Sequence, residues 1–347
     1  MTAAPRDLVL DVGDLETNYY TQAGVVEAVR KVSLEIERGH RVGLVGESGS
    51  GKSTLALSIL GLIEPPGRVV GGSVVLNGCD IAKFSDRQLQ KVRGRQVSLV
   101  FQDPMTALDP VKTIGAQIAE TILRHRRIGR RAARRNAVEL LRDVEVPQAD
   151  RRLDDYPHQY SGGMRQRVLI AIALANEPDL VIADEPTAAL DVTTQAQVLD
   201  VLERLVTERG TAVMLITHNL GVVAEFCDRV FVMYAGRLVE RASADDLFAC
   251  QAHPYSEALL RSVPRPDRLQ RGPLPTIPGS PPSLAHLPPG CPFEPRCPVG
   301  QGLDVCRTQV PVPVAVGDPA DPIVAECHFA QERWSAAVGR SASGGGT

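Results

Sequence analysis

Three short apolar runs lie in the first two thirds of the chain. They span residues 41–45, 180–183 and 212–216, and they are largely continuous rather than alternating between apolar and polar positions. Runs of this length and composition are typical of strands that are buried on both faces of a parallel sheet. Because ligands of open α/β sheets bind beyond the carboxyl ends of such strands, the residues after these runs are the first candidates for a functional site.

Other segments predict a second sheet and a helical region. Residues 7–36 alternate between apolar and polar positions, which predicts strands around a loop near residues 19–24. Residues 71–78 predict a further strand of the same small sheet that ends in an Asn-Gly turn. Residues 97–102 read as a buried strand, and apolar residues recur at helical spacing from residue 114 to about residue 153. Residues 230–240 predict a closing hairpin.

Composition supports a folded core and narrows the class of protein. The chain has 347 residues and is 44% hydrophobic, enough for one large domain and a smaller one. Its net charge of −3 neither favours nor excludes a polyanionic partner. Charged residues interrupt residues 1–20, so no export signal is expected there. The apolar run at residues 168–175 is far shorter than a membrane helix.

A basic run covers residues 124–135. Such a run can mark contact with nucleic acid or anionic lipid. No aromatic residues are interleaved with it, however, and this favours a solvated helix surface.

The segment Gly46–Thr54 fits the phosphate-loop pattern G-x-x-x-x-G-K-[ST] between a predicted strand and a predicted helix. Its glycines allow backbone N–H groups to turn toward an anion, and the helix start adds its positive end. Lys52 is expected to reach the β- and γ-phosphates, and Ser53 to place its hydroxyl on Mg²⁺. A nucleotide triphosphate site is therefore predicted here.

Polar residues at other strand ends extend this site. Asp184 and Glu185 follow one apolar run, and strand alternation points them to different sides, so one suits Mg²⁺ and the other a water molecule. Gln102 and His218 follow two further predicted strands. Tyr19, or else Tyr20, is expected to cover the adenine ring.

A second anion-binding geometry is predicted at residues 161–163. Ser161, Gly162 and Gly163 open a predicted helix, and small residues at a helix start leave N–H groups free for phosphate.

The chain changes character beyond about residue 243. Proline is dense from residue 264 to residue 322, and Cys291, Cys297, Cys306 and Cys327 follow the spacing C-x5-C-x8-C-x20-C. Four thiolates suit a closed zinc site or a [4Fe–4S] cluster, and the spacing alone does not choose between them. We expect such a site to have a structural role in a loop-rich segment, with His286 and His328 as bystanders.

Taken in order, Gly46–Thr54, Gln102, Ser161–Gln166, Asp184–Glu185, Asp191 and His218 resemble the motifs of the ABC-transporter ATPase family across roughly residues 7–245. The Ser-Gly-Gly segment beside a phosphate loop is the discriminating pair. Within that family, residues 156–167, 183–191, 221–225 and 253–260, together with the Cys-Pro-rich tail, are similar to the ATPase subunits of bacterial oligopeptide/dipeptide importers.

The resemblance implies an α/β fold: a P-loop NTPase with a RecA-like parallel sheet, an antiparallel β-subdomain and a helical subdomain at about residues 105–178. It implies a nucleotide-binding domain at residues 1–245 and a cysteine- and proline-rich extension at residues 246–340 with a four-cysteine metal site. Residues 341–347 are expected to be a disordered tail.

The resemblance also implies the roles of the site residues. Glu185 would activate the attacking water, His218 would contact the γ-phosphate, and Ser53, Asp184 and Gln102 would organise Mg²⁺. The implied ATP contacts are Tyr19, Gly46, Ser48, Gly49, Ser50, Gly51, Lys52, Ser53, Thr54, Gln102, Asp184, Ser161, Gly162, Gly163 and Asp191. For the four cysteines the resemblance favours a [4Fe–4S] cluster over zinc. The chain departs from the usual family pattern at Ala188 and Asn219.

In this family two subunits meet head to tail, so Ser161–Gly163 would cover ATP held by a second, related ATPase, and Asp191 would link the two sites. The implied function is ATP hydrolysis that drives uptake of di- or oligopeptides through two membrane permease subunits, supplied by an extracytoplasmic binding protein. The chain would then lie on the cytoplasmic face of a bacterial membrane. Nickel, glutathione or another small solute is an alternative cargo. A non-transport ATPase acting on nucleic acid is the alternative from another class.

Overall fold

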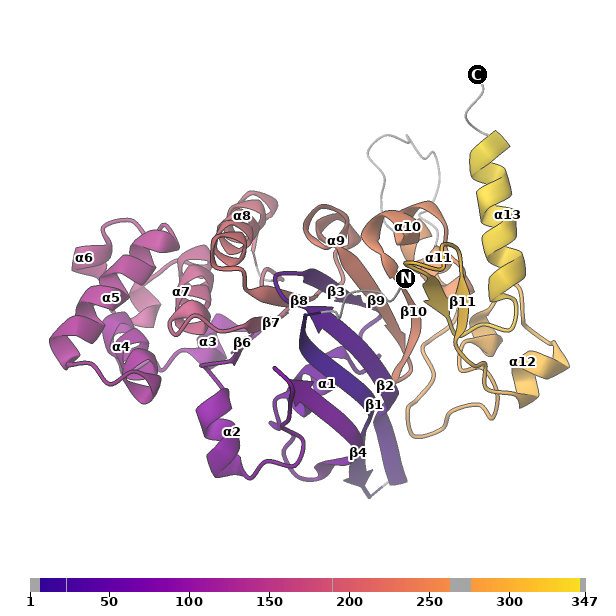
Figure 1. Ribbon diagram of the computed structural model, residues 1–347, viewed down its shortest axis with the longest axis horizontal. Coiled ribbons are helices and arrows are strands. Elements are labelled where there is room, and N and C mark those ends of the chain that lie inside the picture. The colour runs from indigo at the N-terminus through magenta and orange to yellow at the C-terminus, as the bar shows by residue number, and fades with distance from the viewer. Residues whose placement is uncertain (1–6, 23, 189, 263–275, 344–347) are drawn as a thin grey trace.

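The computed structural model describes residues 7–22, 24–188, 190–262 and 276–343. These residues form two sheets with helices around them (Figure 1). Within the described ranges the smaller sheet is antiparallel and has four strands in the order β2-β1-β4-β5. The strands are β1 (Leu8–Thr21), β2 (Gly24–Glu37), β4 (Gly67–Leu76) and β5 (Cys79–Asp80). The small sheet predicted from residues 7–36 and 71–78 is therefore confirmed.

The larger sheet has eight strands among the described residues, in the order β11-β12-β10-β9-β3-β8-β7-β6. Its parallel part contains β3 (Arg41–Val45), β6 (Val97–Val100), β7 (Leu180–Asp184), β8 (Ala212–Ile216) and β9 (Arg229–Tyr234). β9 turns back into antiparallel β10 (Arg237–Ser243), which is the predicted closing hairpin. The three apolar runs are thus neighbouring parallel strands, β3, β8 and β7, as predicted.

Both faces of this sheet are covered, which explains the continuous apolar runs. In β8, Met214 and Ile216 belong to the core under the antiparallel sheet and α1, whereas Val213 and Leu215 belong to the core under the helices of the opposite face. Successive side chains of a strand point to opposite faces, so each strand contributes to both cores. The result is a rigid sheet whose carboxyl edge can hold a site.

Helices surround the sheets, and α3 to α7 gather at one end of the molecule beside β6 and β7 (Figure 1). The bounds are α1 (Lys52–Ile59), α2 (Asp86–Val92), α3 (Pro104–Ala107), α4 (Ile114–His125), α5 (Arg130–Asp143), α6 (Ala149–Arg152), η1 (Pro157–Gln159), α7 (Gly162–Leu174), α8 (Val192–Arg209) and α9 (Leu220–Phe226). This arrangement agrees with the helical segment predicted from residues 114–153.

The basic run lies at the end of α4 and the start of α5. Arg134 makes two hydrogen bonds to Asp154, at 2.8 and 2.7 Å, and Arg126 pairs with Glu177 at 3.0 Å. These pairs are exposed, as expected for a solvated helix surface.

The C-terminal extension, residues 246–343, contains more regular structure than its proline content predicts. Its elements, including α10 at its border, are α10 (Ala244–Ala249), α11 (Pro254–Arg261), η2 (Glu294–Arg296), α12 (Asp304–Thr308), β11 (Val314–Val316), β12 (Ile323–Ala325) and α13 (Ala330–Ser343). β12 pairs with β10, so the extension continues the larger sheet. Of the tail that the sequence predicts to be disordered, residues 341–343 form the end of α13, and residues 344–347 lie outside the described residues.

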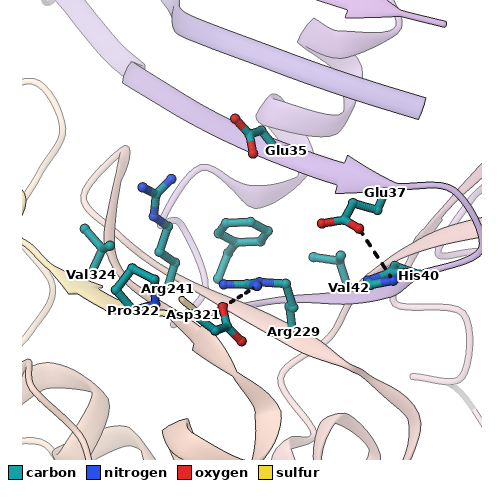
Figure 2. A pocket seen from close by; sticks show the side chains of 10 residues that line it. Glu35, Glu37, His40, Val42, Arg229, Arg241, Asp321, Pro322 and Val324 are labelled. Atoms are coloured by element: carbon teal, nitrogen blue, oxygen red, sulfur yellow. Dashed lines mark hydrogen bonds and ion pairs between the residues drawn. The ribbon is translucent and has the colours of Figure 1, made fainter. Parts of the chain in front are cut away.

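Charged pairs fasten the extension to the rest of the chain. Arg237 makes two bonds to Glu326, at 2.6 and 2.8 Å, and both side chains are largely buried. Arg229 pairs with Asp321 at 2.6 Å in a cavity between β2, β9 and the extension (Figure 2). None of the predicted site residues lines that cavity. The cavity lies at the interface between the extension and the rest of the chain.

Where β10 meets the extension, Glu240 is buried and accepts hydrogen bonds from the N–H groups of Ala252 and His253. Burial raises the pKa of this carboxyl to about 7.

No helix among the described residues is both long and apolar enough to cross a membrane.

Candidate functional site

An open cleft of about 620 Å³ lies at the carboxyl edge of the parallel strands. This volume is in the range of small-ligand sites. The predicted residues that line it are Tyr19, Ser48, Gly49, Gly51, Lys52, Ser53, Thr54, Gln102, Glu185 and His218. Val26, Ala28 and Leu284 complete the lining. Residues from seven separate parts of the sequence thus meet where the strand ends predicted a site.

The phosphate loop connects β3 to α1, as its motif predicts. Gly46 has φ 153°, and a Cβ there would lie 2.1 Å from the Met233 carbonyl oxygen, so only glycine fits. Lys52 Nζ donates to the carbonyl oxygens of Gly46 and Glu47, at 2.8 and 2.9 Å, and to Ser50 Oγ at 3.4 Å. Burial lowers the pKa of Lys52. The loop thus holds a desolvated ammonium group at the cleft, which suits binding of a polyphosphate.

Glu185 is held between the two other polar strand-end residues. Gln102 Nε2 donates to one carboxylate oxygen at 2.8 Å, and His218 Nδ1 lies 3.2 Å from the other. Glu185 has φ 46°, an uncommon left-handed conformation that directs its side chain into the cleft instead of along the sheet face. A carboxylate fixed in this way can orient a water molecule and accept its proton.

Asp184 lies deeper, at the last position of β7. Its carboxylate accepts a hydrogen bond from Ser53, and burial is the main cause that raises its pKa. The Asp184 Oδ1 atom is buried without a hydrogen-bond partner among the described residues. A hydroxyl and an unsatisfied carboxylate oxygen are hard oxygen donors of the kind that Mg²⁺ prefers. The residues Ser53 and Asp184 therefore fit the metal ion that an ATP site requires.

The sequence left open whether Tyr19 or Tyr20 covers the adenine ring, and the structure distinguishes the two. Tyr19 lines the cleft, whereas Tyr20 does not and is 47% exposed. Both lie near the carboxyl end of strand β1 rather than in the predicted loop. Only Tyr19 is placed to contact a bound base.

Ser161, Gly162, Gly163 and Asp191 do not line this cleft. Ser161 Oγ accepts from the Met164 N–H at 3.3 Å and starts α7, while Asp191 caps α8 by accepting from the Thr194 N–H at 3.0 Å. A Cβ on Gly163 would meet Thr194 at 2.4 Å, so the starts of these helices pack closely together. The structure therefore separates this set from Lys52 within one chain.

Asn219, one of the two departures from the family pattern, caps α9. Its side-chain oxygen accepts from the Gly221 and Val222 N–H groups, at 3.1 and 3.4 Å. The adjacent contact of His218 with Glu185 is therefore made without a carboxylate at position 219.

The four cysteines of the extension line a single small cavity. Burial raises the pKa of Cys291 to about 12 and that of Cys327 to about 11. His328 also lines this cavity, and its Nε2 lies 3.0 Å from the Gln309 carbonyl oxygen. Across the described ranges, however, no three His, Cys, Asp or Glu side chains form a group that could hold a metal ion. The convergence of the thiols is thus observed, and the metal site stays a prediction.

Comparison with known proteins identifies the family. The ABC transporter profile matches residues 29–188. A probable peptide ABC transporter ATP-binding protein of Sinorhizobium fredii, y4tR, is 52% identical over 314 residues, which cover 90% of this chain and 93% of the relative. The chain belongs to the ABC transporter family. The profile of the oligopeptide/dipeptide transporter C-terminal region matches residues 239–303 of this ABC protein, which places it in the peptide-importer branch of ATP-binding subunits.

Two further comparisons agree. The oligopeptide transport ATP-binding protein OppD of Mycobacterium tuberculosis is 53% identical over 304 residues, which cover 87% of this chain but 49% of that relative, so the chain spans about half of its length. The dimeric structure of the ATP-binding cassette MJ0796, bound to ADP and Pi, has a TM-score of 0.62 and 30% identity, and covers 68% of this chain and 98% of that one. As an ABC ATPase, the chain binds ATP with Mg²⁺ and hydrolyses it.

Proposed function

We propose that this chain is the ATP-hydrolysing subunit of a bacterial ABC importer that takes up di- and oligopeptides. The observation that carries the cargo class is the match of residues 239–303 to the oligopeptide/dipeptide transporter C-terminal region. The relatives named above, which are peptide and oligopeptide transport proteins, support the same cargo. Nickel, glutathione or another small solute is the alternative cargo for the same machinery.

The cleft residues divide the work of hydrolysis. Lys52 and the loop N–H groups bind the β- and γ-phosphates, while Ser53 and Asp184 hold Mg²⁺, with Gln102 beside them. Tyr19 covers the base. Glu185 accepts the proton of the attacking water, and its contacts with Gln102 and His218 keep the carboxylate aimed at the cleft. His218 contacts the γ-phosphate once ATP is bound.

The site is shared between two subunits in this proposal. Ser161–Gly163 lie outside the chain's own cleft, and their helix start suits a phosphate supplied by another molecule. A second, related ATPase subunit would present the same segment to the ATP at Lys52. Asp191, at the start of α8, would then lie between the two sites. A monomeric preparation is accordingly expected to hydrolyse ATP poorly.

The permease contact is proposed for the helical segment that follows Gln102. Large apolar side chains are exposed in this segment and next to Gln102: Met105 is 56%, Val111 81% and Phe101 46% exposed. Docking on two membrane permease subunits would cover these residues on the cytoplasmic face of the membrane. An extracytoplasmic binding protein would supply the peptide, and no nucleic acid partner is expected.

Purification of the tagged chain from detergent-solubilised membranes tests this function. We expect two integral membrane subunits and a second ATPase to co-purify at about equal amounts. Met105→Glu/Val111→Glu is expected to release the membrane subunits because it places charges on the docking surface. Glu208→Lys, at an exposed residue of α8, is the control. Recovery of nucleic acid with a steep salt dependence, in place of membrane subunits, would contradict the proposal.

For the cysteine cavity we propose a [4Fe–4S] cluster held by Cys291, Cys297, Cys306 and Cys327, with zinc as the alternative. The support is that four cysteines, whose sulfur atoms are soft donors once deprotonated, line one cavity. Bound there, the cluster would serve as a structural link between the end of η2, α12 and the residues that follow β12.

Analysis of anaerobically purified protein tests the cluster. About four iron atoms and four sulfides per chain are expected. Cys297→Ser should lose them and lower the unfolding temperature, whereas Cys79→Ser, at an exposed cysteine outside the cavity, should retain them. One zinc per chain without sulfide would overturn the cluster, and an unchanged unfolding temperature without metal would overturn its structural role.

A further inference from the structure

Glu47, the second residue of the phosphate loop, is bound through all of its polar groups. Its carbonyl oxygen accepts from Lys52 Nζ at 2.9 Å. Its N–H donates to the Tyr255 hydroxyl at 2.8 Å, and its carboxylate oxygens accept from the Arg296 guanidinium at 2.6 and 2.9 Å. Tyr255 and Arg296 both belong to the C-terminal extension. The extension thus contacts the phosphate loop directly, at the residue whose carbonyl binds Lys52.

Other contacts besides Glu47 hold the Arg296 side chain in place. Its Nε donates to the Pro278 carbonyl oxygen at 2.7 Å, and its Nη1 donates to the Tyr234 hydroxyl at 3.3 Å. The Arg296 side chain is only 5% exposed, against 24% for that of Glu47. Tyr234, Tyr255 and Phe293 pack against one another around it, with ring centroids 4.5 to 5.4 Å apart. The Pro278 carbonyl, the Tyr234 hydroxyl and the aromatic rings thus fix the orientation of the guanidinium. Its Nη1 and Nη2 atoms then face Glu47 in the geometry that suits a carboxylate.

We propose that Arg296 is a positioning residue for ATP binding, which holds the phosphate loop in its binding conformation through the Glu47 carboxylate. The proposal rests on the ATPase function assigned above. It gives the extension a role in the nucleotide site of the same chain. Arg296 also connects the nucleotide site to the cysteine cavity, because it immediately precedes Cys297, which lines that cavity.

Two physical effects make the pair matter for ATP. Without Arg296, Glu47 loses the anchor of its side chain and keeps only the Tyr255 bond at its N–H, so the carbonyl that orients Lys52 is held less firmly. The Glu47 carboxylate would also lose its counter-charge beside the site of a polyphosphate, where a partly buried negative charge repels the ligand. Both effects weaken ATP binding. Neither touches Glu185, so the rate of hydrolysis from bound ATP is expected to remain.

The test compares Arg296→Met with Arg237→Met in the purified full-length chain and in the transporter complex. The Arg237–Glu326 pair is a matched control because it is also bidentate, is largely buried and fastens the extension, but it joins the start of β10 to the residue after β12 rather than to the phosphate loop. We expect Arg296→Met to raise the Kd and the KM for ATP about tenfold, with kcat within about twofold of the wild type. Arg237→Met should change the Kd less than about twofold while lowering the unfolding temperature similarly.

A double-mutant cycle tests whether Arg296 acts on ATP binding through Glu47. Measured in a Glu47→Gln background, Arg296→Met should have at most about a threefold further effect on the Kd, because the ion pair is already absent. If Arg296→Met does not fold, Arg296→Lys keeps the charge without the fork and should raise the Kd about threefold. Equal effects of the Arg296 and Arg237 variants, or full additivity with Glu47→Gln, would overturn the proposal. Failure of the wild-type chain to bind ATP would overturn the assigned function, and with it the role proposed for Arg296.

Discussion

Replacement of Glu185 by Gln is expected to lower the ATPase rate of the transporter complex about a thousandfold while ATP binding stays within a few-fold of the wild type. The amide keeps the size and shape of the side chain between Gln102 and His218, but it does not accept a proton from water. The measurement is phosphate release at saturating ATP, together with the Kd for ATP from equilibrium binding.

Glu177→Gln is the matched control, because this exposed glutamate pairs with Arg126 and lies outside the cleft. It should leave both quantities unchanged. If Glu185→Gln retained more than about a tenth of the wild-type rate, another group would have to be the base.

Replacement of Lys52 by Ala is expected to raise the Kd for ATP about 10- to 100-fold, in line with the loss of a charged hydrogen-bond donor to phosphate. The side chain is buried in the loop and its ammonium group is held by the Gly46 and Glu47 carbonyl oxygens, so nothing else in the lining replaces its charge. Equilibrium binding of ATP to the purified chain measures the effect.

Lys112→Ala provides the comparison. Lys112 pairs with Glu120 at 2.8 Å in the helical region and lies outside the cleft lining. Its removal should leave the Kd unchanged. An unaltered Kd in Lys52→Ala would contradict the assignment of Gly46–Thr54 as the phosphate loop.

Much of the site could be predicted because its signals are local. The continuous apolar runs required strands buried on both faces, and β3, β7 and β8 are such strands. Since parallel neighbours end at the same edge, Lys52, Glu185 and His218 had to meet there. The phosphate loop was given by its own spacing, and the structure brings it to the predicted strand ends.

The contribution of the extension could not be predicted in the same way. Arg296 and Glu47 are 249 positions apart, and no periodicity relates them. Leu284 lines the cleft from a proline-rich segment without any motif. The strands β11 and β12 have three residues each, too short to show alternation, and their pairing with β10 comes from tertiary packing.

Two features needed conformational information that residue types do not carry. The sequence shows four cysteines in the extension, but their spacing does not show that they line one cavity. The left-handed backbone of Glu185 turns its carboxylate toward Gln102 and His218, and a glutamate in sequence gives no sign of it.

The most direct test of the account is uptake of a labelled oligopeptide into sealed vesicles that contain the purified complex with its binding protein, with ATP supplied to the side of the vesicle that exposes this chain. The account predicts uptake that requires ATP and Mg²⁺, is abolished by Glu185→Gln and survives Glu177→Gln. Uptake that proceeds unchanged with Glu185→Gln, or ATP hydrolysis that drives no peptide accumulation with the wild-type chain, would contradict it.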